Sequence, residues 1–151
     1  MKRQKRTPGS IIEIDLGNGY LAYAQILEHG GYAFFDYKAT ERPNDFNFLL
    51  NTGILFIIAV HRYVVNKGYW LKVAKLPIRN DLLVLPMKFI QYSSPHFSLY
   101  NPNTGEMTPA TREECEGLEC AAVWEKEHVE SRLLDHFEGR PNIWVEDLKI
   151  K

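Results

Sequence analysis

The sequence predicts an α+β fold, in which a strongly bent antiparallel β-sheet or an open small barrel is packed by a C-terminal helix in a single domain. Short segments of alternating apolar and polar residues, separated by turn residues, fill much of the first hundred positions. A long helical pattern follows only near the C-terminus, and 151 residues is the usual length of one domain. We expect residues 1–7 to be a basic flexible tail and residues 8–151 to be the folded domain.

The beginning of the domain, residues 9 to 37, is predicted to form three strands. The stretch from Ile12 to Leu16 alternates apolar and acidic residues, which gives the first strand one buried and one exposed face. Asn18 and Gly19 favour a tight hairpin turn after it, because both tolerate positive φ. A phosphate-binding loop is excluded, since no helix begins behind the glycine.

The middle of the chain is predicted to contain shorter elements. Residues 54–60 are typical of a buried strand, and this apolar run is far shorter than the roughly 20 residues that a membrane span needs. A helical turn is expected before this strand, and a short helix that Gly68 closes is expected after it. Thr111 begins a capping box that predicts a single-turn helix. Further strands are expected at residues 70–74, 89–92 and 97–100.

The clearest helix lies near the C-terminus. Val129, Leu133 and Phe137 repeat every four residues and define its buried face, and a glycine and a proline end the pattern soon afterwards. Spacing of 100° per residue places a mostly acidic set on the opposite face and Leu134 between the two faces. The members of the opposite face are Glu127, Ser131, Asp135 and Glu138.

No motif for catalysis is present in the sequence. It contains no Gly-x-Ser-x-Gly, no His-Glu-x-x-His and no phosphate loop, and its histidines are scattered. The spacing of Cys115 and Cys120 fits neither a disulfide framework nor a zinc site, so we expect reduced thiols in a cytoplasmic protein. We therefore expect no enzymatic activity, no metal and no cofactor. A small hydrolase whose site has no recognisable motif is kept as an alternative hypothesis.

The net charge of −1 hides an asymmetry along the chain. Residues 2–6 carry four positive charges, whereas acidic residues outnumber basic ones from Glu113 onward. An acidic half binds nucleic acid poorly and suits a basic partner.

The aromatic residues of the first strands leave an alternative function open. On a small barrel, tyrosines and phenylalanines can stack on bases, and the basic tail would then contact the phosphates. Core packing and cross-strand pairing explain the same residues, and few basic side chains lie near them in the sequence. The aromatics in question are Tyr20, Tyr23, Tyr32, Phe34, Phe35 and Tyr37, and Trp70, Trp124 and Trp144 are expected to be core anchors.

Several segments in a fixed order resemble the immunity protein 26 family. Each is mostly apolar residues and turn residues, as in the stretch TPATREECEGLE, and their joint presence makes the resemblance specific. At one place the chain departs from the pattern, because Glu125 and Lys126 follow Trp124 where an aspartate cap and a proline are expected. The segments are Arg3–Ile14, Leu16–Gly19, Tyr23–Leu27, Phe56–His61, Lys75–Pro77, Thr108–Glu119, Ala121–Trp124, Glu127–Glu130, Arg132–Leu133, Asp135–His136 and Arg140–Glu146.

The resemblance implies that residues 8–151 are an immunity-protein domain that acts without catalysis in the bacterial cytoplasm. Its partner would be a toxin C-terminal domain encoded by a neighbouring gene in a polymorphic toxin or contact-dependent inhibition system. Such toxins are often nucleases, and a nuclease is cationic where it grips phosphate. We therefore predict Glu127, Leu134, Asp135 and Glu138 as the toxin-binding residues, with a solvated helix face that contacts nothing as the alternative.

Overall fold

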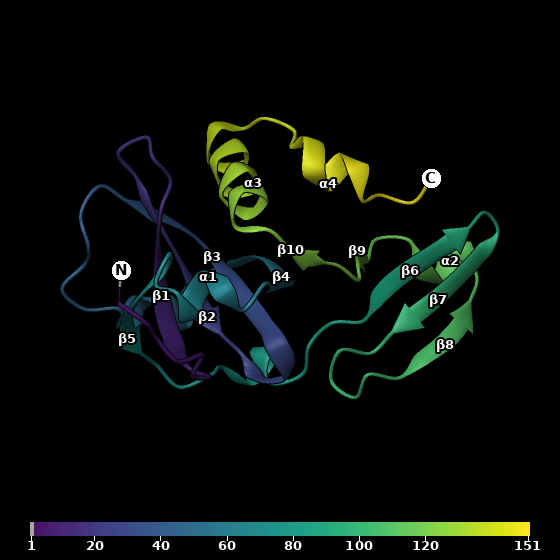
Figure 1. The fold of residues 1–151 in the computed structure, drawn as a ribbon, viewed down its shortest axis with the longest axis horizontal. Helices are drawn as coiled ribbons and strands as arrows, with labels where there is room; N and C mark the ends of the chain where they lie inside the picture. The colour runs from purple at the N-terminus through teal and green to yellow at the C-terminus, as the bar shows by residue number, and fades with distance from the viewer. Residues whose placement is uncertain (1) are drawn as a thin grey trace.

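Residues 2–151, which the computed structural model describes, form two β-sheets with one longer helix, α3, and several short helices around them (Figure 1). The larger sheet has the strand order β10-β4-β3-β2-β1-β5 and the smaller one has the order β8-β7-β6-β9. The strands are β1 (Ser10–Asp15), β2 (Leu21–Ile26), β3 (Gly31–Ala39), β4 (Ile54–Val60), β5 (Leu71–Lys75), β6 (Lys88–Ser93), β7 (His96–Tyr100), β8 (Met107–Ala110), β9 (Glu119–Cys120) and β10 (Val123–Trp124). The α-helices are α1 (Tyr63–Asn66), α2 (Arg112–Cys115), α3 (Lys126–Glu138) and α4 (Ile143–Asp147), and the 3-10 turns are η1 (Glu28–Gly30), η2 (Asn47–Asn51) and η3 (Asn80–Leu82).

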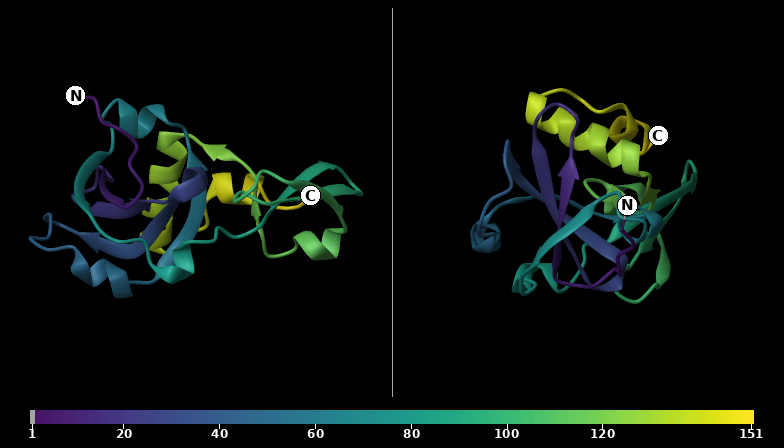
Figure 2. Two further views of the ribbon diagram at one scale, coloured as in Figure 1. Left: turned by 90° about the horizontal axis from the view of Figure 1, so that it is seen from below. Right: turned by 60° about the vertical axis from the view of Figure 1, so that its left-hand side comes forward.

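The larger sheet is buried on both faces. Its strands are antiparallel, except that β10 pairs with β4 in parallel, and bulges interrupt the register between β1 and β5 and along β3. One face, which includes Ile12 and Phe34, packs with α3 and α1 in the main core. The other face, which includes Ile11 and Phe35, packs with η2. Figure 2 shows that the sheet is strongly twisted and that α3 lies across one side of it.

The smaller sheet has its own core, in which Phe89 and Phe97 pack against Cys115 of α2. The predicted α+β class with a C-terminal helix is confirmed, and over the described residues neither sheet closes into a barrel. The strands divide into two sheets because the proline-containing segment from Lys75 to Pro86 leads the chain away from the first sheet. Cys115 and Cys120 are free thiols in this part of the chain.

One extended segment connects the two sheets. Residues 119–120 pair in parallel with β6 of the smaller sheet, and residues 123–124 pair in parallel with β4 of the larger sheet. Arg132 of α3 forms an ion pair with Glu119, and its guanidinium lies 3.6 Å from the ring centre of Phe56. At the C-terminus, Gln91 of β6 accepts a hydrogen bond from the Lys151 amide and donates one to its carbonyl oxygen.

The turn after β1 differs from the predicted two-residue hairpin. In residues 2–151 only His29 among non-glycine residues has a positive φ, so Asn18 does not adopt the conformation that such a turn requires. Gly17 and Gly19 instead have φ of +80° and +90°. The Leu16 amide donates to the Tyr20 carbonyl at 3.0 Å, which closes a wider loop.

The predicted helices are otherwise confirmed in their local details. Val129 and Leu133 are fully buried on α3, and Gly139 ends this helix with φ of +73°. The capping box of α2 is formed by Thr111 and Glu114, each side chain accepting from the other's backbone amide. No helix within residues 2–151 is long and apolar enough to cross a membrane.

The N-terminal segment that we expected to be a flexible tail contacts the folded domain at Gln4, Lys5, Arg6 and Thr7. The amide nitrogen of the Gln4 side chain donates to the carbonyls of Val65 and Trp70, and its oxygen accepts from the Lys72 amide. Arg6 donates to the carbonyls of Leu27 and Gly31. These hydrogen bonds hold the side chains of Gln4 and Arg6 against α1 and the larger sheet.

We predict that Gly19→Val will lower the free energy of unfolding by about 1–2 kcal/mol, because a β-branched residue resists positive φ. A Cβ atom at Gly19 would meet no atom within 4 Å, so the effect would come from the backbone conformation alone. Chemical denaturation measures this change. Gly53→Ala is the control, because Gly53 does not have a positive φ and its added Cβ would meet only Asp36, at 4.0 Å. Equal stabilities of the Gly19 variant and the wild type would contradict the prediction.

A candidate partner-binding surface

The four residues predicted to bind the partner differ in how exposed they are. Glu127 is exposed near the beginning of α3, and Leu134 is half-buried further along the helix. Asp135 is largely covered, with 18% of its side chain exposed, and Glu138 at the end of the helix is exposed to 39%. The helical spacing places the three acidic residues on the outer side of α3 and Leu134 at its edge, and the four side chains differ in exposure.

Asp135 and Glu138 are engaged with residues that follow the helix. Arg140 donates to Asp135 at 2.9 Å and forms an ion pair with Glu138. The buried Asn142 donates to Asp135 at 2.9 Å and also caps the beginning of α4. The hydrogen bond from Asn142, together with Arg140, holds the pKa of the Asp135 carboxyl below its usual value. This end of the acidic face thus connects α3 to α4 and is largely neutralised.

At the other end of α3, an exposed aromatic residue of α4 packs on the helix. The Trp144 side chain of α4 stacks on His128 with 3.6 Å between ring centres and an interplanar angle of 14°. Trp144 is 36% exposed, so our prediction that it is a core anchor was wrong, whereas Trp70 and Trp124 are buried as predicted. Trp144 lies outside the core because Val145 of α4, and Leu148 just after this helix, pack against the core instead.

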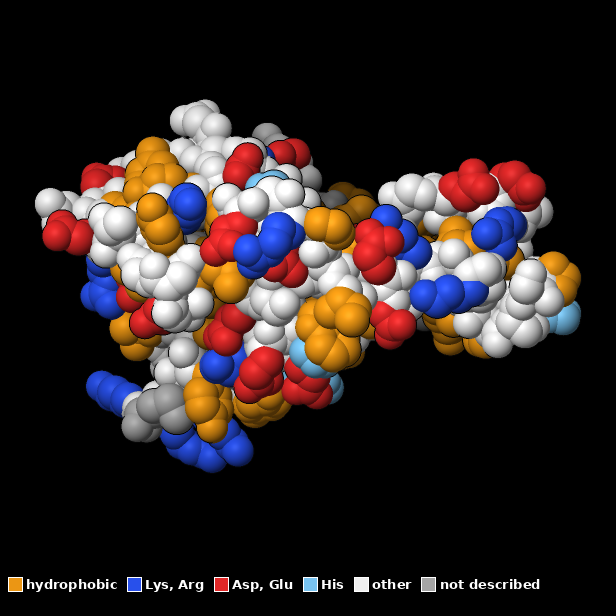
Figure 3. Space-filling view, turned by 90° about the horizontal axis from the view of Figure 1, so that it is seen from above, with side chains coloured by type: hydrophobic (Ala, Val, Ile, Leu, Met, Phe, Trp, Pro, Cys, Tyr) orange, Lys and Arg blue, Asp and Glu red, His pale blue; other side chains and the backbone are white. Residues whose placement is uncertain are grey.

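A groove of about 240 Å³ lies beside this aromatic pair. Its lining residues include apolar ones from β10 and α4 and the acidic Glu125 and Asp147. Figure 3 shows an apolar patch bordered by acidic and histidine side chains near the middle of the face that carries α3 and α4. Val123 is 54% exposed and lines both this groove and a second cavity, so the two hollows meet at β10.

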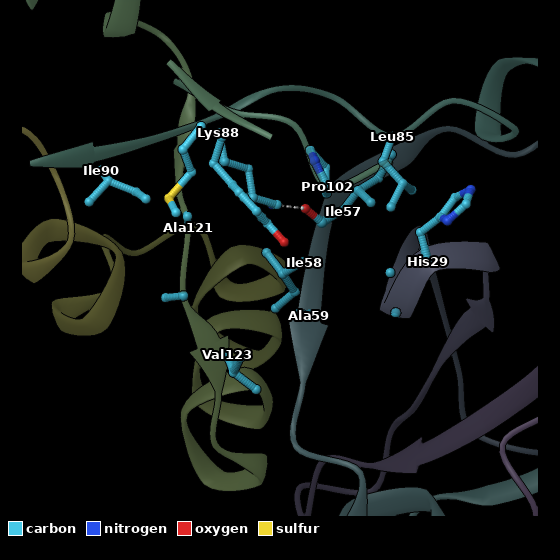
Figure 4. Close-up of a pocket in the computed structure, with 15 residues that line it drawn as sticks. His29, Ile57, Ile58, Ala59, Leu85, Lys88, Ile90, Pro102, Ala121 and Val123 are labelled. Carbon is cyan, nitrogen blue, oxygen red and sulfur yellow. Dashed lines mark hydrogen bonds between the residues drawn. The ribbon is translucent and has the colours of Figure 1, made fainter. Parts of the chain in front are cut away.

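The second cavity is a largely apolar cleft of about 280 Å³ between the two sheets. Ile57 and Ala59 of β4 line one side, and Lys88 and Ile90 of β6 line the other. In Figure 4 Lys88 points across the cleft toward β4, and its ammonium donates to the Ile57 carbonyl at 2.8 Å. Lys88 is only 5% exposed, and this burial lowers the pKa of its ammonium below the usual value.

The described residues contain no arrangement that indicates metal chemistry. Among residues 2–151 no three His, Cys, Asp or Glu side chains come together as a possible metal site. Burial raises the pKa of the Cys115 and Cys120 thiols, so neither resembles an activated nucleophile. The exposed residues of this face include the aromatic Trp144 and the apolar Val123, which are residue types that protein interfaces favour. They lie beside carboxylates, which suit a basic partner.

The chain belongs to the immunity protein 26 family, because the model of this family matches residues 7–95. The matched part contains β1 to β6, whereas α3, α4 and the groove lie outside it. The motifs quoted from the sequence extend further than this match, to Glu146. No curated protein and no solved structure matches the chain.

We predict that Asp135→Asn will lower the free energy of unfolding by about 1 kcal/mol near neutral pH, because the hydrogen bond that the buried Asn142 donates loses its charged acceptor. The lost ion pair with the exposed Arg140 adds little to this. The pKa of Asp135 is lower in the folded state than its ordinary value of 3.8, so this stabilisation is present above that value. It is lost as the pH falls through the lower, folded-state pKa. Urea denaturation of both proteins across this range measures the difference, which should shrink in acid. A difference that is independent of pH would contradict this assignment.

We predict that Lys88→Ala will lower the free energy of unfolding by about 2–4 kcal/mol, because it opens a cavity and leaves the Ile57 carbonyl without its donor. Lys88→Met is the matched control, since it keeps the apolar stem and removes only the ammonium, and its effect should be smaller. Chemical denaturation of the two variants compares them. A larger loss of unfolding free energy for Lys88→Met than for Lys88→Ala would contradict the prediction, because it would mean that packing of the aliphatic stem contributes little.

Proposed function

We propose that this protein binds a cognate bacterial toxin domain and neutralises it by forming a non-covalent complex. Membership of the immunity protein 26 family is the observation that carries the proposal. The protein would act in the cytoplasm and without catalysis, in a polymorphic toxin or contact-dependent inhibition system, on a toxin encoded by a neighbouring gene.

The surface of α3 and α4 supports binding to a basic partner. Glu127 and Asp147 are exposed, and neither carboxylate is in an ion pair in the described part of the chain. Unpaired carboxylates attract a cationic protein during approach and pair with its cations on contact. A nuclease toxin has such a cationic face where it holds phosphate, so we propose a nuclease as the target. The predicted contact residues Glu127, Leu134, Asp135 and Glu138 remain part of this proposal.

The alternative of nucleic-acid binding has less support. Tyr23, Tyr32, Phe34 and Phe35 are at most 1% exposed, so these rings are unable to stack on bases. Arg6 from the basic segment is already hydrogen-bonded to the sheet.

We predict that co-expression of this protein will rescue cells from the toxin domain encoded beside its gene, and that the two will elute as one complex in size-exclusion chromatography. The same toxin domain expressed alone, and an unrelated toxin domain with this protein, are the controls. Growth arrest that persists despite soluble expression of both proteins would contradict the proposal. Salt-sensitive binding to DNA or RNA without toxin binding would favour the alternative.

A further inference from the structure

We propose that the groove beside Trp144 holds an arginine side chain of the partner protein. This inference rests on the proposed function for the identity of the partner, but the chemistry of the groove is testable without it. We call this site the arginine groove. It is defined by Val123 and Trp124 of β10, Glu125 and His128 at the beginning of α3, and Trp144 and Asp147 of α4.

The size and lining of the arginine groove fit one long side chain. Its volume of about 240 Å³ lies below the roughly 300–1,000 Å³ of pockets that hold small molecules or cofactors. Buried Trp124 and half-buried Leu148 provide apolar lining, along which the aliphatic stem of an arginine can pack. Trp144 also lines the groove; His128 stacks on one face of its ring, and the side chain is still 36% exposed, so an aromatic surface is left for a planar cation.

The charges around the arginine groove leave its carboxylates available. The nearby lysines are already engaged: Lys126 pairs with Glu130 and Lys149 pairs with Glu146. Lys151 donates to the main-chain carbonyls of Glu146 and Asp147. In the described residues the carboxylate of Asp147 has no hydrogen-bond or ion-pair partner. The groove therefore presents negative charge to a partner.

Glu125 is held in place at the rim of the groove. One carboxylate oxygen accepts from the Tyr63 hydroxyl at 3.0 Å, and the other lies 3.2 Å from a ring nitrogen of His61. Each carboxylate oxygen has two lone pairs, so Glu125 keeps acceptor capacity for a further donor. Its side chain is 48% exposed, which leaves it accessible to a partner.

Arginine fits this set better than lysine. A guanidinium is planar, stacks on aromatic rings and offers five donors in a fixed fork, whereas an ammonium is a strongly hydrated point charge. The protein uses the same combination internally, around Trp124. There Arg132 lies 5.1 Å from the Trp124 ring centre and pairs with Glu119.

The first test uses the peptide acetyl-Gly-Arg-Gly-amide and NMR spectroscopy of the whole protein. We expect the peptide to shift the indole resonance of Trp144 saturably. The same peptide with citrulline, a neutral isostere of arginine, should bind at least threefold more weakly, and a lysine peptide should fall between them. Equal shifts with arginine and citrulline, or no shift at Trp144, would overturn the proposal whatever the toxin does.

The second test uses substitutions at the rim. Asp147→Asn should weaken binding of the arginine peptide at least threefold while the NMR spectrum of the folded protein is otherwise kept. Glu41→Gln is the matched control, because it removes one exposed carboxylate from the loop that follows β3. If Asp147→Asn leaves the affinity unchanged, or Glu41→Gln weakens it equally, the arginine groove is not the binding site.

The third test uses the toxin domain encoded beside the gene and calorimetry with the full chain. If the proposal holds, Trp144→Ala and Asp147→Asn will each weaken the complex at least tenfold, and Glu41→Gln will not. Wild-type affinity in both groove variants would overturn the groove as the interface, while the proposed function would stand. If the wild-type chain does not bind the toxin, the proposed function fails and so does the assignment of the groove to that partner.

Discussion

The arrangement of this molecule depends on the extended segment from Glu119 to Trp124, which belongs to both sheets. Its first two residues pair with β6 and its last two pair with β4, both in parallel. Such short parallel ladders contribute few hydrogen bonds, so side chains must hold the segment in place. Arg132 does this from α3, because it pairs with Glu119 and lies over Phe56 and Trp124. The position of α3, the cleft between the sheets and the arginine groove all follow from this junction.

The family match covers the strands on which the fold is built, and the candidate binding surface comes after it in the sequence. The family match ends at residue 95, after the framework strands β1 to β6, whereas β10, α3 and α4 all come later. Trp124 contributes to both the core and the surface, since it packs in the main core and also lines the arginine groove. Exposed residues such as Asp147 and Val123 are therefore able to change with little effect on the core, as expected for surface substitutions.

Local signals in the sequence predicted much of the fold, and long-range contacts explain what they missed. The strand at 54–60, the capping box at Thr111 and the buried face of α3 are set by neighbouring residues, and all three are present. The division into two sheets was missed because β9 and β10 have two residues each, too few to show a period, and both pair with distant strands. Likewise, helical spacing placed Asp135 on the outer face correctly, but its partners come from beyond the end of the helix.

The arginine groove could not be predicted from the spacing of residues in the sequence, because it forms only where β10, α3 and α4 come into contact. One feature of the sequence did indicate an exposed aromatic residue. Trp144 follows the glycine and proline that end α3, and a large aromatic residue in such a short helix has few neighbours to bury it. Each wall of the groove is fixed by a contact within the protein: Trp144 by His128, Glu125 by Tyr63 and α4 by the Asn142–Asp135 hydrogen bond. A side chain that enters a groove with fixed walls loses less free energy to ordering. Because Arg140 neutralises the far end of α3, the unpaired acidic charge of this face lies toward the groove, where a cation would bind.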